Sequence, residues 1–156
     1  MASVIPSRVT HRYDGDLVVF LIGMRINKVW RPDLWLPVFR AMPRMLAELA
    51  RDPESGFLGS RLIFDPRGPW LVQYWNSVEK LYDYASNSEA THRPAWTAFN
   101  KRARKAPGAV GIWHETFEVA RAESIYVGMP PSGLAAATEV IPVARRKDRA
   151  AERLAA

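Results

Sequence analysis

The 156-residue chain contains no cysteine, carries a formal net charge of +6 and has a pI near 10.0. Its length suits one domain that buries enough apolar surface to fold without a disulfide or a structural metal. The lack of cysteine excludes thiol catalysis, disulfides, cysteine-ligated zinc and iron–sulfur clusters. The N-terminal residues have no signal-peptide pattern and no window is apolar enough to cross a bilayer, so we expect a soluble, cytoplasmic protein with no membrane partner.

The positive charge lies mainly outside the central part of the chain. Basic residues gather in residues 145–153 and near the N-terminus, whereas basic and acidic residues nearly balance between residues 13 and 130. The centre retains one basic cluster, which consists of Lys101, Arg102, Arg104 and Lys105. Residues so closely spaced wrap around a helix, so we expect a solvated helix end whose cations complement the helix dipole. We predict no nucleic-acid partner.

The first half of the chain predicts a strand followed by a helix. Residues 16–27, DLVVFLIGMRIN, form a nearly continuous apolar run, which is typical of a strand buried on both faces. Residues 31–51 then place apolar side chains at helical spacing. Pro37 falls within the first turn of this helix, but Pro43 should kink or break it near Ala41.

The second half predicts a hairpin, a second helical region and two more strands. FLGSRLIF and WLVQYW flank the turn DPRGP, so residues 57–75 indicate a β-hairpin. A helix begins after the capping residues Asn76 and Ser77, pauses at SNSEATHRP and resumes over residues 95–105. The run AVGIWHETFEVA and the shorter run ESIYVGM predict the last two strands, and the remainder indicates loop and a frayed tail.

This order of elements predicts an α+β fold with a ferredoxin-like antiparallel sheet and helices on one face. The other face also carries apolar groups that one subunit cannot cover. Packing two such sheets together would close a barrel around a cavity, so we predict a homodimer, a dimeric α+β barrel whose interior holds the ligand. The expected organisation is an N-terminal extension at 1–14, a barrel domain at 15–131, and a C-terminal extension and charged tail at 132–156.

The stretch GIWHETF, residues 111–117, contains a histidine beside a glutamate. Adjacent residues of a strand point to opposite faces, so His114 and Glu115 cannot form a simple dyad. The sequence does not fix which of them faces a cavity. His114 has three candidate roles: a hydrogen-bonded structural histidine, a general base or donor to a bound ligand, and an axial ligand to haem iron.

The stretch THRPAWTAFNKR contains the other candidate histidine. His92, Trp96, Phe99 and Asn100 share one helical face if the helix has begun at His92. Tryptophan and phenylalanine at this spacing are usually core residues, but a histidine and an asparagine among them would need partners when buried, and a ligand is one possible partner. No metal-binding histidine spacing, Rossmann glycine motif or P-loop is present. The abundance of aromatic residues suits a flat, apolar ligand.

Five stretches, in this order and spacing, are similar to a monooxygenase-like family of small bacterial and fungal proteins: IGMRINKVWRP, RGPWLVQYW, HRPAWTAFN, VGIWHETFEV and ESIYVGMPPSGL. The resemblance covers about residues 8–146. It implies the dimeric α+β barrel fold. That fold includes antibiotic-biosynthesis monooxygenases, which oxidise electron-rich aromatic or polyketide substrates with O₂ and often without a cofactor. It also includes haem proteins such as chlorite dismutases and aldoxime dehydratases.

The resemblance, together with the two histidine stretches, leads to a monooxygenase hypothesis. In its cofactor-independent form, His92 or His114 removes an acidic proton, the substrate carbanion reduces O₂, and Asn100 or Arg25 stabilises negative charge. The expected substrate-binding residues are Trp75, Trp96, Phe99, Trp113, Glu115 and Tyr126. No metal bound by protein side chains alone is expected.

Two alternatives remain open at this point. In the first, the protein binds haem, with His114 or His92 as the axial ligand. In the second, it is a non-catalytic module that binds a small molecule, because a fold does not fix a function.

Overall fold

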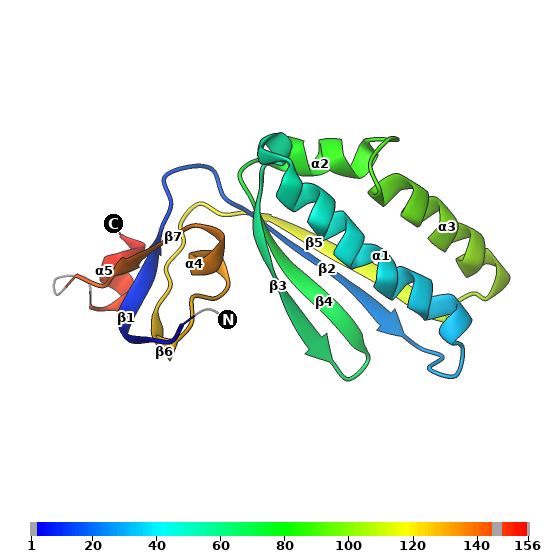
Figure 1. Cartoon of the computed structure of the whole chain (residues 1–156), viewed down its shortest axis with the longest axis horizontal. Helices are drawn as coiled ribbons and strands as arrows, with labels where there is room; N and C mark the ends of the chain where they lie inside the picture. The colour runs from blue at the N-terminus through cyan, green and yellow to red at the C-terminus, as the bar shows by residue number, and fades with distance from the viewer. Residues whose placement is uncertain (1–2, 145–147, 156) are drawn as a thin grey trace.

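The computed structural model describes residues 3–144 and 148–155, which form two antiparallel sheets and a layer of helices (Figure 1). The larger sheet has the strand order β3-β4-β2-β5 and the smaller sheet the order β6-β1-β7. The bounds in the larger sheet are β2 (Val18–Ile26), β3 (Phe57–Asp65), β4 (Gly68–Trp75) and β5 (Val110–Glu118). The main helices are α1 (Pro32–Arg51), α2 (Val78–Ser86) and α3 (His92–Lys105).

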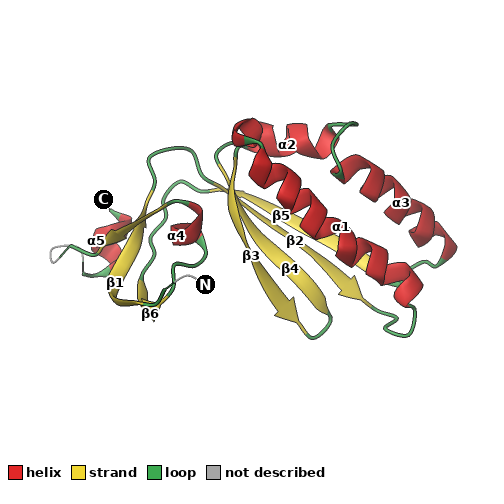
Figure 2. Cartoon of the chain, viewed as in Figure 1, coloured by secondary structure: helices red, strands yellow, loops and turns green. Residues whose placement is uncertain are grey.

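The predicted ferredoxin-like arrangement is confirmed. The apolar run of β2 occupies the interior of the sheet and pairs antiparallel with both β4 and β5. Strands β3 and β4 form the expected hairpin. Helices α1, α2 and α3 all lie on one face of this sheet (Figure 2). The short helix α4 (Leu134–Ala137) touches the sheet at the edge strand β3, where a Cβ atom on Gly59 would lie 2.9 Å from Ala137.

Helix α1 differs from its prediction because it continues through Pro43. The helix runs unbroken from Pro32 to Arg51 with both internal prolines included. Proline at this position removes one backbone hydrogen bond. Leu34, Met45 and Leu49 are buried on either side of it, so the packing of both halves against the sheet holds the helix together.

The packed core lies toward the α2 end of the helix layer. Val18, Leu49, Trp75 and Leu81 form one buried cluster, and Trp75 is only 1% exposed. The Nε1 atom of Trp75 donates a hydrogen bond to Oε1 of the buried Gln73 at 3.1 Å, which satisfies both polar groups. A fully buried tryptophan of this kind contributes several kcal/mol, on the order of 3–5, to folding.

The smaller sheet combines strands from both ends of the described chain. It contains β1 (Ile5–Arg12), β6 (Tyr126–Met129) and β7 (Glu139–Pro142). The ESIYVGM strand, which the sequence placed within the barrel domain at 15–131, pairs with β1 of the N-terminal extension. The difference arises because residues 5–12 and 139–142, which the sequence indicated as extension and loop, supply two extended partners.

Short elements complete the fold. They are η1 (Pro53–Ser55), α4 (Leu134–Ala137) and α5 (Ala150–Leu154). The expected frayed tail therefore contains one short helix, while residues 145–147 of its basic segment lie outside the described residues. No helix in the described ranges is both long and apolar enough to cross a membrane.

Candidate functional site

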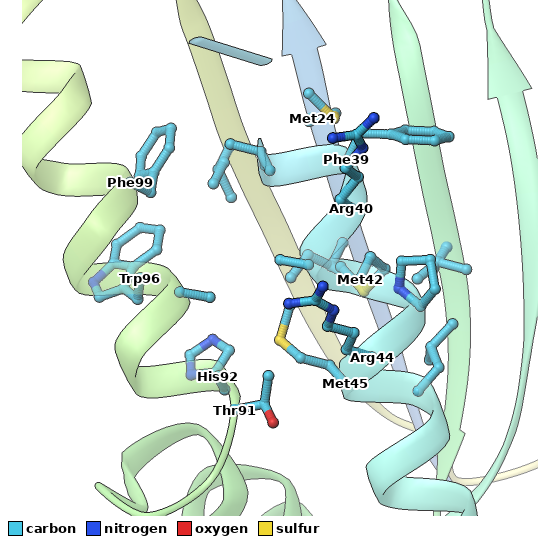
Figure 3. A pocket seen from close by; sticks show the side chains of 18 of the residues that line it. Met24, Phe39, Arg40, Met42, Arg44, Met45, Thr91, His92, Trp96 and Phe99 are labelled. Carbon is cyan, nitrogen blue, oxygen red and sulfur yellow. The ribbon is translucent and has the colours of Figure 1, made fainter. Parts of the chain in front are cut away.

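A large cavity separates helices α1 and α3 from the sheet beneath them (Figure 3). Its volume is about 1420 Å³, enough for a molecule of several fused rings. The lining is mostly apolar and comes from α1, α3 and the helix-facing side of β2 and β5. Its members include Phe20, Ile22, Met24, Leu36, Phe39, Met42, Met45, Trp96, Phe99 and Ile112.

His92 is the first residue of α3 and lines this cavity (Figure 3). Its Nδ1 atom lies 3.0 Å from the carbonyl oxygen of Ala85, near the end of α2. A carbonyl oxygen only accepts hydrogen bonds, so Nδ1 carries the proton and donates. In the neutral ring the other nitrogen, Nε2, then has a free lone pair and can accept a proton.

A hydrogen-bonded group next to His92 fixes the start of α3. The Glu48 carboxylate of α1 accepts hydrogen bonds from the Tyr84 hydroxyl at 3.0 Å and from the Thr91 amide at 3.1 Å. Burial would raise the pKa of Glu48, but the bonds from Thr91 and Tyr84 outweigh it and lower that pKa. Burial, together with the bond to Glu48, raises the pKa of Tyr84, which stays a neutral donor. We name Glu48, Tyr84 and Thr91 the α1–α3 clip.

His114 lies on the sheet side of the same cavity. It pairs with Ile22 on β2, and its ring centroid lies 5.6 Å from that of Phe20. Residues facing the helices alternate with residues facing away, so this register places His114 toward α1 and α3. Its ring makes no hydrogen bond within the described residues, and it is exposed to the cavity. Both predicted histidines therefore reach one cavity.

Aromatic side chains of α3 form one wall. Trp96 and Phe99 follow His92 at helical spacing, and their rings stack with centroids 5.4 Å apart. Trp96 is well exposed, although it lines the cavity, so its ring offers a flat surface to a ligand. Trp96 and Phe99, both predicted to bind substrate, therefore line the cavity.

Two predicted substrate-binding residues lie on the wrong face of the sheet for this cavity. Trp113 and Glu115 flank His114, and the strand period turns both away from the helices. The Trp113 ring lies 5.9 Å from that of Trp70 across Gly23. A Cβ atom at Gly23 would come within 2.7 Å of the Trp113 ring and within 2.6 Å of Trp70, so only glycine permits this arrangement.

Four other predicted site residues also lie outside the cavity lining. Arg25 is exposed beyond the apolar half of β2 and donates a hydrogen bond to Asn27. Trp75 belongs to the packed core, and Tyr126 belongs to the smaller sheet, where its hydroxyl accepts a bond from the Ala135 amide. Asn100 lies on α3 beside the cavity-facing stripe but not in it. The sequence predicted that Asn100 lies on the same helical face as His92. Asn100 lies eight residues after His92, and at that spacing its side chain points away from the stripe that lines the cavity.

The sequence analysis missed the cationic part of the lining. Arg40 and Arg44 of α1 and Arg102 of α3 all line the cavity. The prediction that this basic cluster is a solvated helix end is therefore wrong for Arg102, which lines the cavity. The other three residues of the cluster, Lys101, Arg104 and Lys105, lie outside the lining. A detectable signal was present, because Arg102 follows Phe99 by three residues and continues the stripe that starts at His92.

The comparisons with known proteins agree on a family. A family model described as monooxygenase af470-like matches residues 17–134. A curated relative, monooxygenase af470 from Aspergillus fumigatus, is 32% identical over 129 residues, which make up 75% of this chain and 44% of that protein. The chain therefore spans less than half the length of this relative.

Solved structures resemble the chain more distantly. SnoaB, a cofactor-independent oxygenase from Streptomyces nogalater, is 15% identical with a TM-score of 0.49, covering 69% of this chain and 97% of that one. A dimeric protein of unknown function and ferredoxin-like fold from Bacteroides fragilis is 12% identical with a TM-score of 0.42, covering 65% of this chain and 96% of that one. Because the family model matches most of its residues, the chain belongs to the monooxygenase af470-like family.

Proposed function

We propose that this protein is a monooxygenase that oxidises a flat, aromatic, polyketide-like molecule with O₂ and without a cofactor. The observation that carries the proposal is His92, whose Nδ1 is held by the Ala85 carbonyl at 3.0 Å inside a large apolar cavity. This bond leaves Nε2 as a base in a fixed orientation. General bases need such positioning before their pKa matters.

The reaction starts when His92 Nε2 takes a proton from a carbon flanked by aromatic rings. The carbanion passes one electron to O₂, and the resulting carbon radical and superoxide combine to form a C–O bond. The imidazolium of His92 returns its proton to the distal oxygen, giving a hydroperoxide. Loss of water then breaks the O–O bond and the second C–H bond. One oxygen atom ends in a product carbonyl and the other in water, so the substrate is the sole reductant.

The remaining cavity residues have supporting roles. The stacked rings of Trp96 and Phe99 hold a flat substrate by dispersion and exclude water. His114, across the cavity from α3, donates a hydrogen bond to the substrate oxygen on which charge gathers as the carbanion forms. The apolar lining strengthens this bond by lowering the local dielectric.

The test is oxygen consumption with anthrone, whose methylene lies between two rings. Replacing the base, His92→Gln, should lower turnover by about 10²- to 10⁴-fold, the range for lost general-base catalysis. His11→Gln is the matched control, because His11 lies in the smaller sheet and bonds to Ser124. Equal activity of His92→Gln and the wild type would refute the mechanism. Binding without any oxygen uptake would indicate a non-catalytic binding module instead.

Haem binding remains a second candidate because a histidine whose other nitrogen donates to a carbonyl suits axial ligation. His92 would hold the iron through Nε2, and haem would supply O₂ activation when bound. Reconstitution with haem distinguishes the two candidates. We expect no Soret band shift on titration of haem, and a shift that disappears in His92→Gln but not in His11→Gln would favour the haem enzyme.

We further propose that the protein works as a homodimer. The face of the sheet away from α1, α2 and α3 carries Trp113 at 37% exposure and Phe117 at 49% exposure. A second copy packed against it would cover these side chains and close the barrel. The cavity lies on the opposite face and is formed by one subunit.

A further inference from the structure

Arg102 has a donor that nothing in the described chain satisfies. Its Nε atom is buried, and no hydrogen-bond acceptor within the described residues contacts it. A guanidinium group cannot lose its charge in a protein, and an unsatisfied donor on it costs more than a neutral one. Such a group is stabilised when an acceptor arrives with a ligand.

The cavity is where that acceptor would come from. Arg102 lines the cavity and lies on the same helical stripe as His92, Trp96 and Phe99. The neighbouring wall on α1 adds Arg40 and Arg44, whose side chains appear among the lining residues in Figure 3. The lining is therefore apolar, with its positive charges on the two helices.

The acids in the lining do not neutralise Arg102. They are Asp33 and Glu89. Asp33 is held by Arg31 through two hydrogen bonds at 2.9 and 2.7 Å. Glu89 precedes α3 and so lies at the His92 end of the helix, whereas Arg102 is ten residues further along, roughly 15 Å at the helical rise.

We propose that the substrate carries a carboxylate that Arg102 binds at the end of the cavity opposite His92. A rotation of the Arg102 side chain on ligand binding would expose Nε, so that Nε and an adjacent Nη present the parallel pair of donors that matches the two oxygens of a carboxylate. This inference rests on the proposed function for the identity of the reacting carbon. It adds that the acid and that carbon lie at opposite ends of an elongated, fused-ring molecule, on the scale of the roughly 15 Å between their helical positions.

The test compares anthracene-2-carboxylate with its methyl ester, which has the same ring system without the charge. Binding is followed by titration calorimetry in the absence of turnover. The wild type should bind the acid about 10- to 100-fold more tightly than the ester, the range for a hydrogen bond to a charged group. Equal affinities would overturn the proposal without any variant being needed.

Two variants assign the preference to one residue. Arg102→Met keeps much of the side-chain length and apolar packing but removes the donors, and should abolish the preference by lowering the affinity for the acid. Arg104→Met is the matched control, since Arg104 is exposed on the same helix and outside the lining. A preference that survives in Arg102→Met, with thermal melting showing it folded, would contradict the assignment.

The outcomes also separate this inference from the monooxygenase proposal. An acid preference that depends on Arg102, in a protein that consumes no oxygen, would uphold the carboxylate site and refute the enzyme. Oxygen consumption that depends on His92, with no preference for the acid over the ester, would uphold the enzyme and refute the carboxylate site.

Discussion

The two faces of the four-stranded sheet are both apolar, but one is covered by helices that enclose a cavity and the other exposes aromatic side chains. On the helix side, Phe20, Ile22 and His114 look across a cavity at α1 and α3. On the other side, Trp113 and Phe117 are exposed and are not covered by α1, α2 or α3 (Figure 2). A face that is covered but incompletely filled suits a small molecule, whereas a bare aromatic face suits a protein surface. Adjacent residues of one strand, such as Trp113 and His114, thus face two different kinds of surface.

The largest expected effect is on stability, in the packed core on the helix side of the sheet. Trp75→Ala should lower the free energy of unfolding by about 3–5 kcal/mol, because it empties the packed core. Urea denaturation measures the loss. Trp30→Ala is the control, since Trp30 is exposed and should change stability little. Similar losses for both variants would mean that Trp75 is not a core residue.

The next largest effect concerns the bare face. Introducing two charges, Trp113→Glu with Phe117→Glu, should convert a dimer to a monomer in sedimentation velocity, because the association would bury unpaired carboxylates. Phe64→Glu serves as the control, because Phe64 is highly exposed near the tip of the β3–β4 hairpin. A double variant that stays dimeric would move the interface elsewhere.

The sharpest comparison of the two faces uses neighbouring residues. His114→Phe fills similar space but cannot donate, so it should lower kcat/KM about tenfold, the cost of roughly one hydrogen bond to the transition state. Glu115→Gln should leave kcat/KM unchanged. Steady-state oxygen uptake measures both. Equal losses in the two variants would contradict the assignment of the faces.

The smallest effect lies outside the four-stranded sheet. Burial lowers the pKa of His11 below its usual value of 6.5, with Glu123 opposing the shift. The unfolded chain therefore binds a proton before the folded one, so stability is full above about pH 6.5 and declines as the pH falls toward the lower folded-state pKa. Hydrogen-exchange protection factors, which correct for the intrinsic pH dependence of amide exchange, should fall in β1 and β6 but not in β4 as the pH is lowered from about 7.5 to 5.5. His11→Gln should remove that difference.

Sequence patterns predicted the sheet, its helices and the separation of His114 from Glu115, because strand and helix periods are local properties. They predicted the cavity only in part. His92, Trp96 and Phe99 were found from one stripe, but the facing residues on α1 and β2 are brought there by tertiary packing. Arg102 was hidden among other basic residues, since charge alone does not indicate which of them is buried. The smaller sheet was missed because β6 and β7 have only four residues each and β1 lies far from both in the sequence.

The α1–α3 clip links the two helices by hydrogen bonds at one end of the cavity, the end where His92 lies. Glu48 lies near the end of α1 and Thr91 just before α3, while the two helices run in opposite directions (Figure 1). In the described residues no side-chain hydrogen bond joins the Pro32 end of α1 to the Lys105 end of α3. We therefore expect ligands to enter and leave between those two ends, while the α1–α3 clip keeps His92 in position.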